Sequence, residues 1–205
     1  MSADGKKVSL YVFFADDGLG TDDKLVLAAQ RYTGRPQTLT VVRTERGKPY
    51  FDNCSLIHVS PSHSGKYFVC AIADFPVGVD VQIHTGLREE PPEEMAVRLN
   101  RIAKRYFSPE EAAFIRDDTC DRFFALWTAR ESYVKYTGQG IDGVFESLCV
   151  LPAGTGSIPK TEKPDQIAKW RALGVAFRQV RLAPDYTLCV CAQEDFSLEI
   201  TWLAK

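Results

Sequence analysis

The chain has 205 residues, of which 45% are hydrophobic and 11% aromatic, so it can bury a core and is not a disordered chain. Lys and Arg number 25 against 27 Asp and Glu, and the resulting net charge of −2 argues against a general nucleic-acid binder, which carries a basic excess. The length suits one compact unit of one or two lobes.

The first apolar run, Val8 to Ala15, has the length of a strand. It is too short to cross a bilayer and lacks a small-residue cleavage site, so we expect neither a membrane span nor a signal peptide. Six cysteines are scattered without a C-x-x-C pair, and most lie in apolar runs. We interpret them as reduced, buried thiols rather than disulfide partners or zinc ligands, and we expect a cytoplasmic protein.

The first half of the chain predicts one helix among several strands. Thr21 is expected to cap a helix over residues 22–32, with acidic residues in its first turn and Gly34 after its end. Apolar and β-branched runs predict strands over 8–14, 38–43, 56–59, 67–73 and 77–83. The segment 60–66 is rich in Ser, Pro and Gly, and we interpret it as a turn between two strands.

The second half opens with three predicted helices and returns to strands. One helix is expected over 93–107, and a second, short helix begins at a capping box formed by residues 108–111. The third is expected over 120–137, where Gly138 ends it. Strands are predicted over 147–151, 175–181, 187–191 and 198–202, and 152–164 reads as an exposed loop. The predicted class is α+β, with helices and mostly antiparallel strands in each of two related lobes.

The first candidate segment for a functional site is the strand that carries Asp80 and Gln82 between valines. Residues two apart in a strand share a face, so the carboxylate and amide oxygens point the same way. Such oxygen ligands suit Mg²⁺, which takes one or two carboxylates together with substrate phosphates. The alternative interpretation is a half-exposed strand with a polar outer face.

Glu131 and Lys135 form a second candidate pair, because residues four apart lie on the same face of a helix. The alternative is an ordinary surface ion pair. The helix is strongly apolar, however, and Gly138 and Gly140 follow it directly, which favours a site that binds a metal and a phosphate side by side.

The segment 60–66 is the third candidate, since a turn of this composition can aim the Ser62 hydroxyl, the His63 imidazole and backbone N–H groups at a phosphate. The alternative is a plain polar turn. No G-x-S-x-G elbow surrounds the serine, so we do not expect a serine hydrolase, and there is no Walker-type loop or dinucleotide fingerprint. His58 and His84 are interpreted as structural.

In order and spacing, these segments resemble the 4′-phosphopantetheinyl transferases, in particular the single-chain, pseudo-dimeric branch that modifies peptide and polyketide carriers. That family shows an S-H-S-G turn, a G-[IV]-D-[IV]-E strand, and a W-[ST]-x-K-E-x-x-x-K helix followed by a glycine pair. The matching segments here are 62–65, 78–82, 127–135 and the pair Gly138/Gly140. The Gly47-Lys48-Pro49 segment and residues 102–108 match as well, so the resemblance covers residues 47–140.

The resemblance implies a single transferase unit over 1–205, built as a pseudo-dimer from an N-terminal lobe 1–84 and a C-terminal lobe 85–205. Its active site would lie in the cleft between the lobes. The implied reaction is Mg²⁺-dependent transfer of the 4′-phosphopantetheine arm from coenzyme A to a serine of an apo acyl or peptidyl carrier protein, with release of 3′,5′-ADP. The implied partners are coenzyme A and the carrier, not nucleic acid or membrane, and such a chain can work as a monomer.

The family pattern also implies a role for each matching residue. Asp80 and Glu131 would bind Mg²⁺, with Gln82 as a third ligand through its amide oxygen. Lys135 would offset the charge of the pyrophosphate during transfer.

Other positions would hold the rest of coenzyme A. Ser62 and His63 would bind phosphate oxygens, His63 those of the 3′-phosphate, and Lys48 would lie near the adenine end. Lys24 corresponds loosely to a phosphate-binding arginine of the family.

Two positions depart from the family pattern. Gln82 stands where the family has a second metal-binding acid, and Arg101 stands where bacterial relatives place a glutamate proposed as general base. A guanidinium cannot accept a proton, so the base is left open among Glu131, a metal-bound hydroxide, and Glu93 or Glu94.

Arg101 belongs to a group of four basic residues on one predicted helix, which either steers an acidic carrier or forms an ordinary solvated face. The four are Arg98, Arg101, Lys104 and Arg105. Two other functions remain as alternatives: a non-catalytic coenzyme A or nucleotide-binding member of the family, and an unrelated α+β interaction scaffold.

Overall fold

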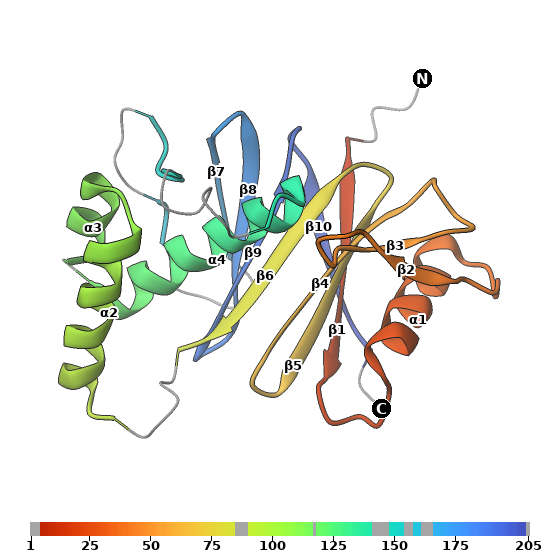
Figure 1. Ribbon diagram of the computed structural model, residues 1–205, viewed down its shortest axis with the longest axis horizontal. Coiled ribbons are helices and arrows are strands. Elements are labelled where there is room, and N and C mark those ends of the chain that lie inside the picture. Colours follow the sequence, from red (N-terminus) through yellow and green to blue (C-terminus); the bar gives the residue numbers. More distant parts are fainter. Residues whose placement is uncertain are drawn as a thin grey trace.

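The structure is a computed structural model that describes residues 5–84, 90–116, 118–140, 148–153, 158–160 and 166–203 (Figure 1). It is an α+β protein with mostly antiparallel sheets, as predicted. Its helices are α1 (Thr21–Thr33), α2 (Pro92–Tyr106), α3 (Pro109–Arg116) and α4 (Thr119–Thr137). Its strands are β1 (Lys7–Phe14), β2 (Val41–Arg43), β3 (Pro49–Phe51), β4 (His58–Ser64), β5 (Tyr67–Ala73), β6 (Val77–Ile83), β7 (Ile167–Ala172), β8 (Val175–Ala183), β9 (Tyr186–Ala192) and β10 (Ser197–Trp202).

The strands form two four-stranded sheets and the short β2–β3 ribbon. The first sheet has the order β10-β1-β5-β4, and β10 pairs with β1 in parallel, so the last strand returns to the first. The second sheet has the order β6-β9-β8-β7 and is antiparallel throughout.

The molecule is built in four layers: α1, the first sheet, the second sheet, and the helices α2–α4 (Figure 1). Alternating side chains of β1 explain the inner layers, because residues two apart in a strand share a face. Leu10 and Val12 pack against the second sheet, whereas Tyr11 and Phe13 pack with the side chains of α1. Strand β6 belongs to the second sheet and β10 to the first, and the division into lobes at residue 84 stays a prediction.

Helix α4 lies against the second sheet, and two features of the sequence fix its position. Gly78 of β6 has no side chain, and a Cβ at this position would overlap the backbone of Ser132 and Tyr136 in α4. The buried Arg130 donates hydrogen bonds to the carbonyl oxygens of Tyr106 (2.5 Å) and Leu148 (2.7 Å). Gly78 thus lets α4 lie directly on β6, and Arg130 ties α4 to the end of α2 and to the segment at Leu148.

Several element predictions are confirmed closely. The strands over 67–73 and 77–83 have the predicted bounds, and α4 ends at Gly138 with a φ of 68°. At the start of α3, the Glu111 carboxylate accepts from the Ser108 N–H and the Ser108 hydroxyl accepts from the Glu111 N–H, which confirms the capping box.

Other element predictions are wrong in the first half of the chain. Helix α1 begins at Thr21 with Gly20 as its N-cap, because the Asp23 carboxylate accepts the Gly20 N–H. The predicted strand 38–43 is reduced to β2. The predicted turn at 60–66 is mostly strand β4, and only Gly65 and Lys66 make the turn to β5.

The predicted strand at 147–151 is also wrong over its described part, 148–151. Here side chains satisfy the backbone in place of a neighbouring strand: the Val150 N–H donates to Glu111, and the Val150 carbonyl accepts from the Trp170 indole. Strands β3 and β7 were not predicted. All six cysteines are free thiols, and in the described parts of the chain no helix is long and apolar enough to cross a membrane.

Candidate active site

Asp80 lies in the middle of β6, on the face that α4 covers. The residue is 5% exposed, and it lies two residues after Gly78, where α4 approaches most closely. The alternation of β6 therefore buries a carboxylate directly beneath a helix.

Lys135 of α4 reaches this carboxylate. Its ammonium lies 2.7 Å from Asp80 Oδ1 and 2.9 Å from Ser62 Oγ on β4. Ser62 in turn donates a hydrogen bond of 2.7 Å to Asp80 Oδ1. Three residues that are distant in sequence thus converge from β4, β6 and α4.

The second oxygen of Asp80 is different. Oδ2 is buried and has no hydrogen-bond partner among the described residues. A buried carboxylate oxygen without a partner is costly in a folded protein, so its position calls for a donor or a cation.

Glu131 lies one turn before Lys135 on α4, and the charges of Asp80 and Lys135 act on its carboxyl group. Its pKa is raised to about 7, first by burial and then by the negative charge of Asp80, while Lys135 acts in the opposite direction. Two carboxylates therefore share one nearby ammonium in a poorly solvated place. Two carboxylates this close together in a buried place are typical of a site that binds a cation.

A cavity of about 410 Å³ opens beside these groups. The residues that line it are Arg46, Gly47, Lys48, Pro49, Ser60, Pro61, Glu131, Val134, Lys135, Gly138 and Gly140.

Lys48, directly before β3, lines this cavity. Its ammonium donates to the carbonyl oxygens of Lys135 (2.6 Å) and Tyr136 (2.9 Å), and burial lowers its pKa. Cations bind well at a helix C-terminus, where carbonyl groups lack partners. The β2–β3 turn is thereby tied to the end of α4.

The predicted site residues are thus brought together in part. Ser62, Asp80 and Lys135 are in direct contact, Glu131 is coupled to them by charge, and Lys48 borders the same cavity.

Three other predicted residues lie elsewhere. Gln82 is half-buried and shares the Asp80 face of β6. His63 is exposed, and because β4 is a strand, its side chain points away from the face of Ser62. Lys24 is buried in contact with Asp17 and does not line the cavity.

Sequence reasoning included Ser60, Pro61, Gly78 and Val134 only as members of the candidate segments 60–66, 78–82 and 127–135, and it missed a role of their own. Two signals could have singled out some of them. Serines at 60, 62 and 64 repeat with the period of a strand, and a glycine inside a valine-rich strand marks a close backbone approach.

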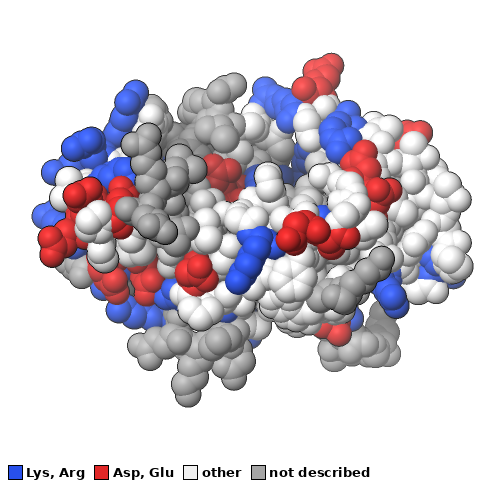
Figure 2. Space-filling model, turned by 90° about the horizontal axis from the view of Figure 1, so that it is seen from below, with Lys and Arg blue, Asp and Glu red and all other residues white. Residues whose placement is uncertain are grey.

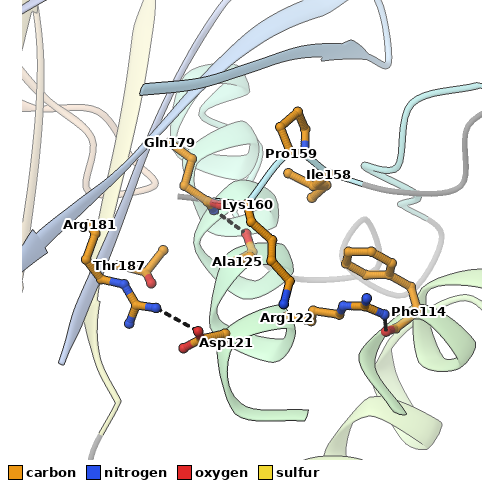
Figure 3. A pocket seen from close by; sticks show the side chains of 10 residues that line it. All are labelled: Phe114, Asp121, Arg122, Ala125, Ile158, Pro159, Lys160, Gln179, Arg181 and Thr187. Carbon is orange, nitrogen blue, oxygen red and sulfur yellow. Dashed lines mark hydrogen bonds and ion pairs between the residues drawn. The ribbon is translucent and has the colours of Figure 1, made fainter. Parts of the chain in front are cut away.

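A second hollow, of about 320 Å³, lies on the other flank of α4 (Figure 3). Here Arg181 reaches Asp121 at 2.7 Å and also contacts the Nδ1 of the buried His84 at 3.2 Å. A guanidinium only donates, so this nitrogen of His84 is the acceptor and the ring proton is on Nε2, which faces Thr187 at 2.7 Å. The three potential metal ligands His84, Cys120 and Asp121 meet here, but the cation among them is Arg181.

A comparison with protein families matches residues 76–191 of the chain to the 4′-phosphopantetheinyl transferase superfamily. The chain belongs to this superfamily. The matched segment contains β6 and α4, and with them Asp80, Gln82, Glu131 and Lys135, whereas Lys48 and Ser62 lie before it.

Two relatives of this family member are proteins of Bacillus subtilis. A 4′-phosphopantetheinyl transferase of Bacillus subtilis is 32% identical over 142 residues, which are 67% of this chain and 58% of the relative. The 4′-phosphopantetheinyl transferase Sfp of Bacillus subtilis strain 168 is 28% identical over 165 residues, 78% of this chain and 66% of the relative. The chain thus spans about three fifths to two thirds of the length of these relatives.

The site of this family member fits a divalent cation. Asp80 Oδ2 is a buried acceptor with no partner in the described part of the chain, and Glu131 is a second carboxylate held close to it. Hard cations such as Mg²⁺ prefer oxygen ligands of this kind. Asp80 and Glu131 are the residues that would hold the ion.

Proposed function

We propose that this chain is a 4′-phosphopantetheinyl transferase that moves the phosphopantetheine arm of coenzyme A to a serine of an apo acyl or peptidyl carrier protein. The proposed reaction depends on Mg²⁺ and releases 3′,5′-ADP. The observation that carries the proposal is the buried Asp80 in contact with Lys135, which lines a cavity together with Glu131. Family membership supports the same activity.

In the proposed reaction the serine oxygen of the carrier forms a bond to the phosphorus that bears pantetheine, and the bond from that phosphorus to 3′,5′-ADP breaks. A bound Mg²⁺ supplies positive charge for the pyrophosphate oxygens. Asp80 and Glu131 would hold it, with Gln82 as a third ligand. The ammonium of Lys135 stabilises the charge that develops on the leaving 3′,5′-ADP.

The serine proton needs an acceptor, and we assign it to Glu131. Without a bound cation the pKa of Glu131 is about 7, and a cation on one of its oxygens would lower this pKa and keep the carboxylate ionised, so that it can accept the proton. A carboxylate has two oxygens, so one can contact a cation while the other accepts a proton. Glu93 and Glu94, the other acids considered, lie exposed in the first turn of α2.

The finer predictions belong to the same proposal. The cavity next to Lys48 would receive coenzyme A in a cleft between two lobes, 1–84 and 85–205, with Ser62 and His63 near its phosphates. The protein would act in the cytoplasm as a monomer. The carrier would approach the α2 end of the molecule, where Lys and Arg gather together with Asp and Glu (Figure 2).

The test is to incubate the protein with coenzyme A, Mg²⁺ and an apo-carrier protein and to weigh the carrier by mass spectrometry. We expect the carrier to gain the mass of one phosphopantetheine, one 3′,5′-ADP to appear for each carrier modified, and both to stop in excess EDTA. Coenzyme A binding with an unmodified carrier would instead indicate the non-catalytic alternative. Modification that continues unchanged in EDTA would contradict the metal-dependent reaction.

A further inference from the structure

The two sheets meet along β4 and β6 through serine side chains. The hydroxyl oxygens of Ser60, Ser62 and Ser64 accept hydrogen bonds from the N–H groups of Val79 (3.1 Å), Val81 (3.3 Å) and Ile83 (3.0 Å). The other edge of β6 pairs with β9, so the serines satisfy the N–H groups on the edge that no strand covers. We call this row of three serines the serine seam.

Ser62 is the member of the seam whose hydroxyl also contacts charged side chains. A hydroxyl offers one donor hydrogen and two acceptor sites. The Val81 N–H and the Lys135 ammonium can only donate, and they use both acceptor sites. The single donor hydrogen is given to Asp80 Oδ1. The hydrogen-bonding capacity of Ser62 is therefore used up within the protein.

This saturation has a consequence for the Asp80 carboxylate. Oδ1 accepts from both Ser62 and Lys135 at 2.7 Å, which fixes the rotation of the carboxylate. Oδ2 is then the oxygen that no described residue contacts by a hydrogen bond. A phosphate oxygen needs a donor, and Ser62 could supply one only by releasing Asp80.

We propose that Ser62 is a positioning residue, whose hydroxyl orients Asp80 for a cation and holds Lys135, and that it is not a ligand of the coenzyme A phosphates. This inference rests on the proposed function, and it replaces the role that the family resemblance implies for Ser62. Groups behind a metal ligand commonly change metal affinity by about 10- to 100-fold when they are removed.

The test compares Ser62→Ala with Ser64→Ala, which loses an equivalent seam hydrogen bond but no contact with Asp80 or Lys135. Two affinities are measured by calorimetry: Mg²⁺ without coenzyme A, and coenzyme A without metal in EDTA. We expect Ser62→Ala to weaken Mg²⁺ binding by about tenfold or more and to leave metal-free coenzyme A binding within about twofold. Ser64→Ala should change neither affinity. Ser62→Thr, which keeps the hydroxyl, should restore Mg²⁺ binding.

The opposite pattern would overturn the inference. If Ser62→Ala weakened metal-free coenzyme A binding and left Mg²⁺ binding unchanged, Ser62 would be a phosphate ligand. Equal Mg²⁺ losses in Ser62→Ala and Ser64→Ala would show that the seam acts only through the fold. If Ser62→Ala does not fold, Ser62→Cys, with its weaker donor, takes its place and should show an intermediate Mg²⁺ affinity.

Both affinities are measured without a carrier, so they remain informative if no transfer is found. Absence of transfer by the native protein contradicts the proposed function, whereas an unchanged Mg²⁺ affinity in Ser62→Ala contradicts the inference about Ser62.

Discussion

On the flank of α4 that faces β4, Asp80 and Glu131 share the ammonium of Lys135, and one oxygen of Asp80 is buried without a partner. On the opposite flank, which faces β8, Asp121 is bound by Arg181 (Figure 3). Asp118 is bound by Lys160. Each of these two acids on the second flank has a cationic partner, whereas Asp80 Oδ2 on the first flank has no hydrogen-bond partner among the described residues. The two flanks of one helix therefore differ: the charges of the second are paired within the fold, and the buried oxygen of the first is free to accept an added cation.

The largest effect is expected for Glu131→Gln, which removes the charge of one carboxylate from the first flank. Turnover should fall by about a thousandfold or more, since electrostatic stabilisation of phosphoryl transfer carries effects of this size. The protein should fold normally, because an ionised buried carboxylate is a cost to the native state. Rates of carrier modification and urea unfolding curves check both expectations, and a rate near that of the native protein would contradict the role of Glu131.

The next largest effect is a pH dependence of the Mg²⁺ affinity, caused by the titration of Glu131. The pKa of Glu131 is about 7, well above its ordinary value of 4.5, so the group is largely protonated below pH 7. A cation binds the carboxylate form, and Mg²⁺ affinity without coenzyme A should fall as the pH drops below 7, by up to about tenfold per pH unit. In Glu131→Gln this dependence should be absent. An equally steep dependence in that variant would place the titrating group elsewhere.

The two flanks should also shift stability with pH in opposite directions. Burial raises the pKa of Glu131, so its contribution to stability is complete below pH 4.5 and is lost as the pH rises towards 7. The pKa of His84 is lowered from 6.5 to about 4 by burial and by Arg181. Its contribution is complete above pH 6.5 and is lost as the pH falls towards 4.

Urea unfolding between pH 4 and 8 tests this contrast. Glu131→Gln should remove the loss on the alkaline side, and His84→Gln should reduce the loss on the acid side at a general cost of about 1–2 kcal/mol, a usual size for a buried substitution. His84→Gln should keep its turnover at pH 7.5. The contrast would be contradicted if both variants changed the pH profile in the same direction.

The smallest effect concerns α2. Arg98 is already bound by Glu90 at 2.5 Å, whereas Arg101 and Lys104 are exposed. Reversing the charges with Arg101→Glu and Lys104→Glu should raise the KM for an acidic carrier a few-fold and flatten its salt dependence, because these charges steer encounter more than they bind. The affinity for coenzyme A should not change. Equal losses for both substrates would indicate a structural role for the helix.

The sequence predicts well those elements whose pattern is local. Strand β6 has its predicted bounds because its valines alternate with other residues and turn residues flank the run. Helix α4 ends at Gly138 because glycine accepts the left-handed conformation. The pairing of β10 with β1 was not predictable in this way, since the two strands lie at opposite ends of the chain.

The candidate site shows the same limit. Spacing alone placed Glu131 and Lys135 on one face of a helix, and strand alternation marked Asp80. Composition marked the segment around Ser62, and the family motifs then gave each residue a role. The segment around Ser62 was predicted as a turn because serine, proline and glycine favour turns. It is a strand because its serines satisfy the backbone of β6, a tertiary interaction that no local pattern reports.

The comparison of the two flanks is tested most directly by intact-mass time courses of an apo-carrier with coenzyme A and Mg²⁺. The native protein, Asp80→Asn and Asp121→Asn would be run in parallel, one aspartate from each flank of α4. The account predicts that the native protein and Asp121→Asn add one phosphopantetheine at similar rates, while Asp80→Asn leaves the carrier unmodified over the same time. Modification by Asp80→Asn as fast as by the native protein would contradict it.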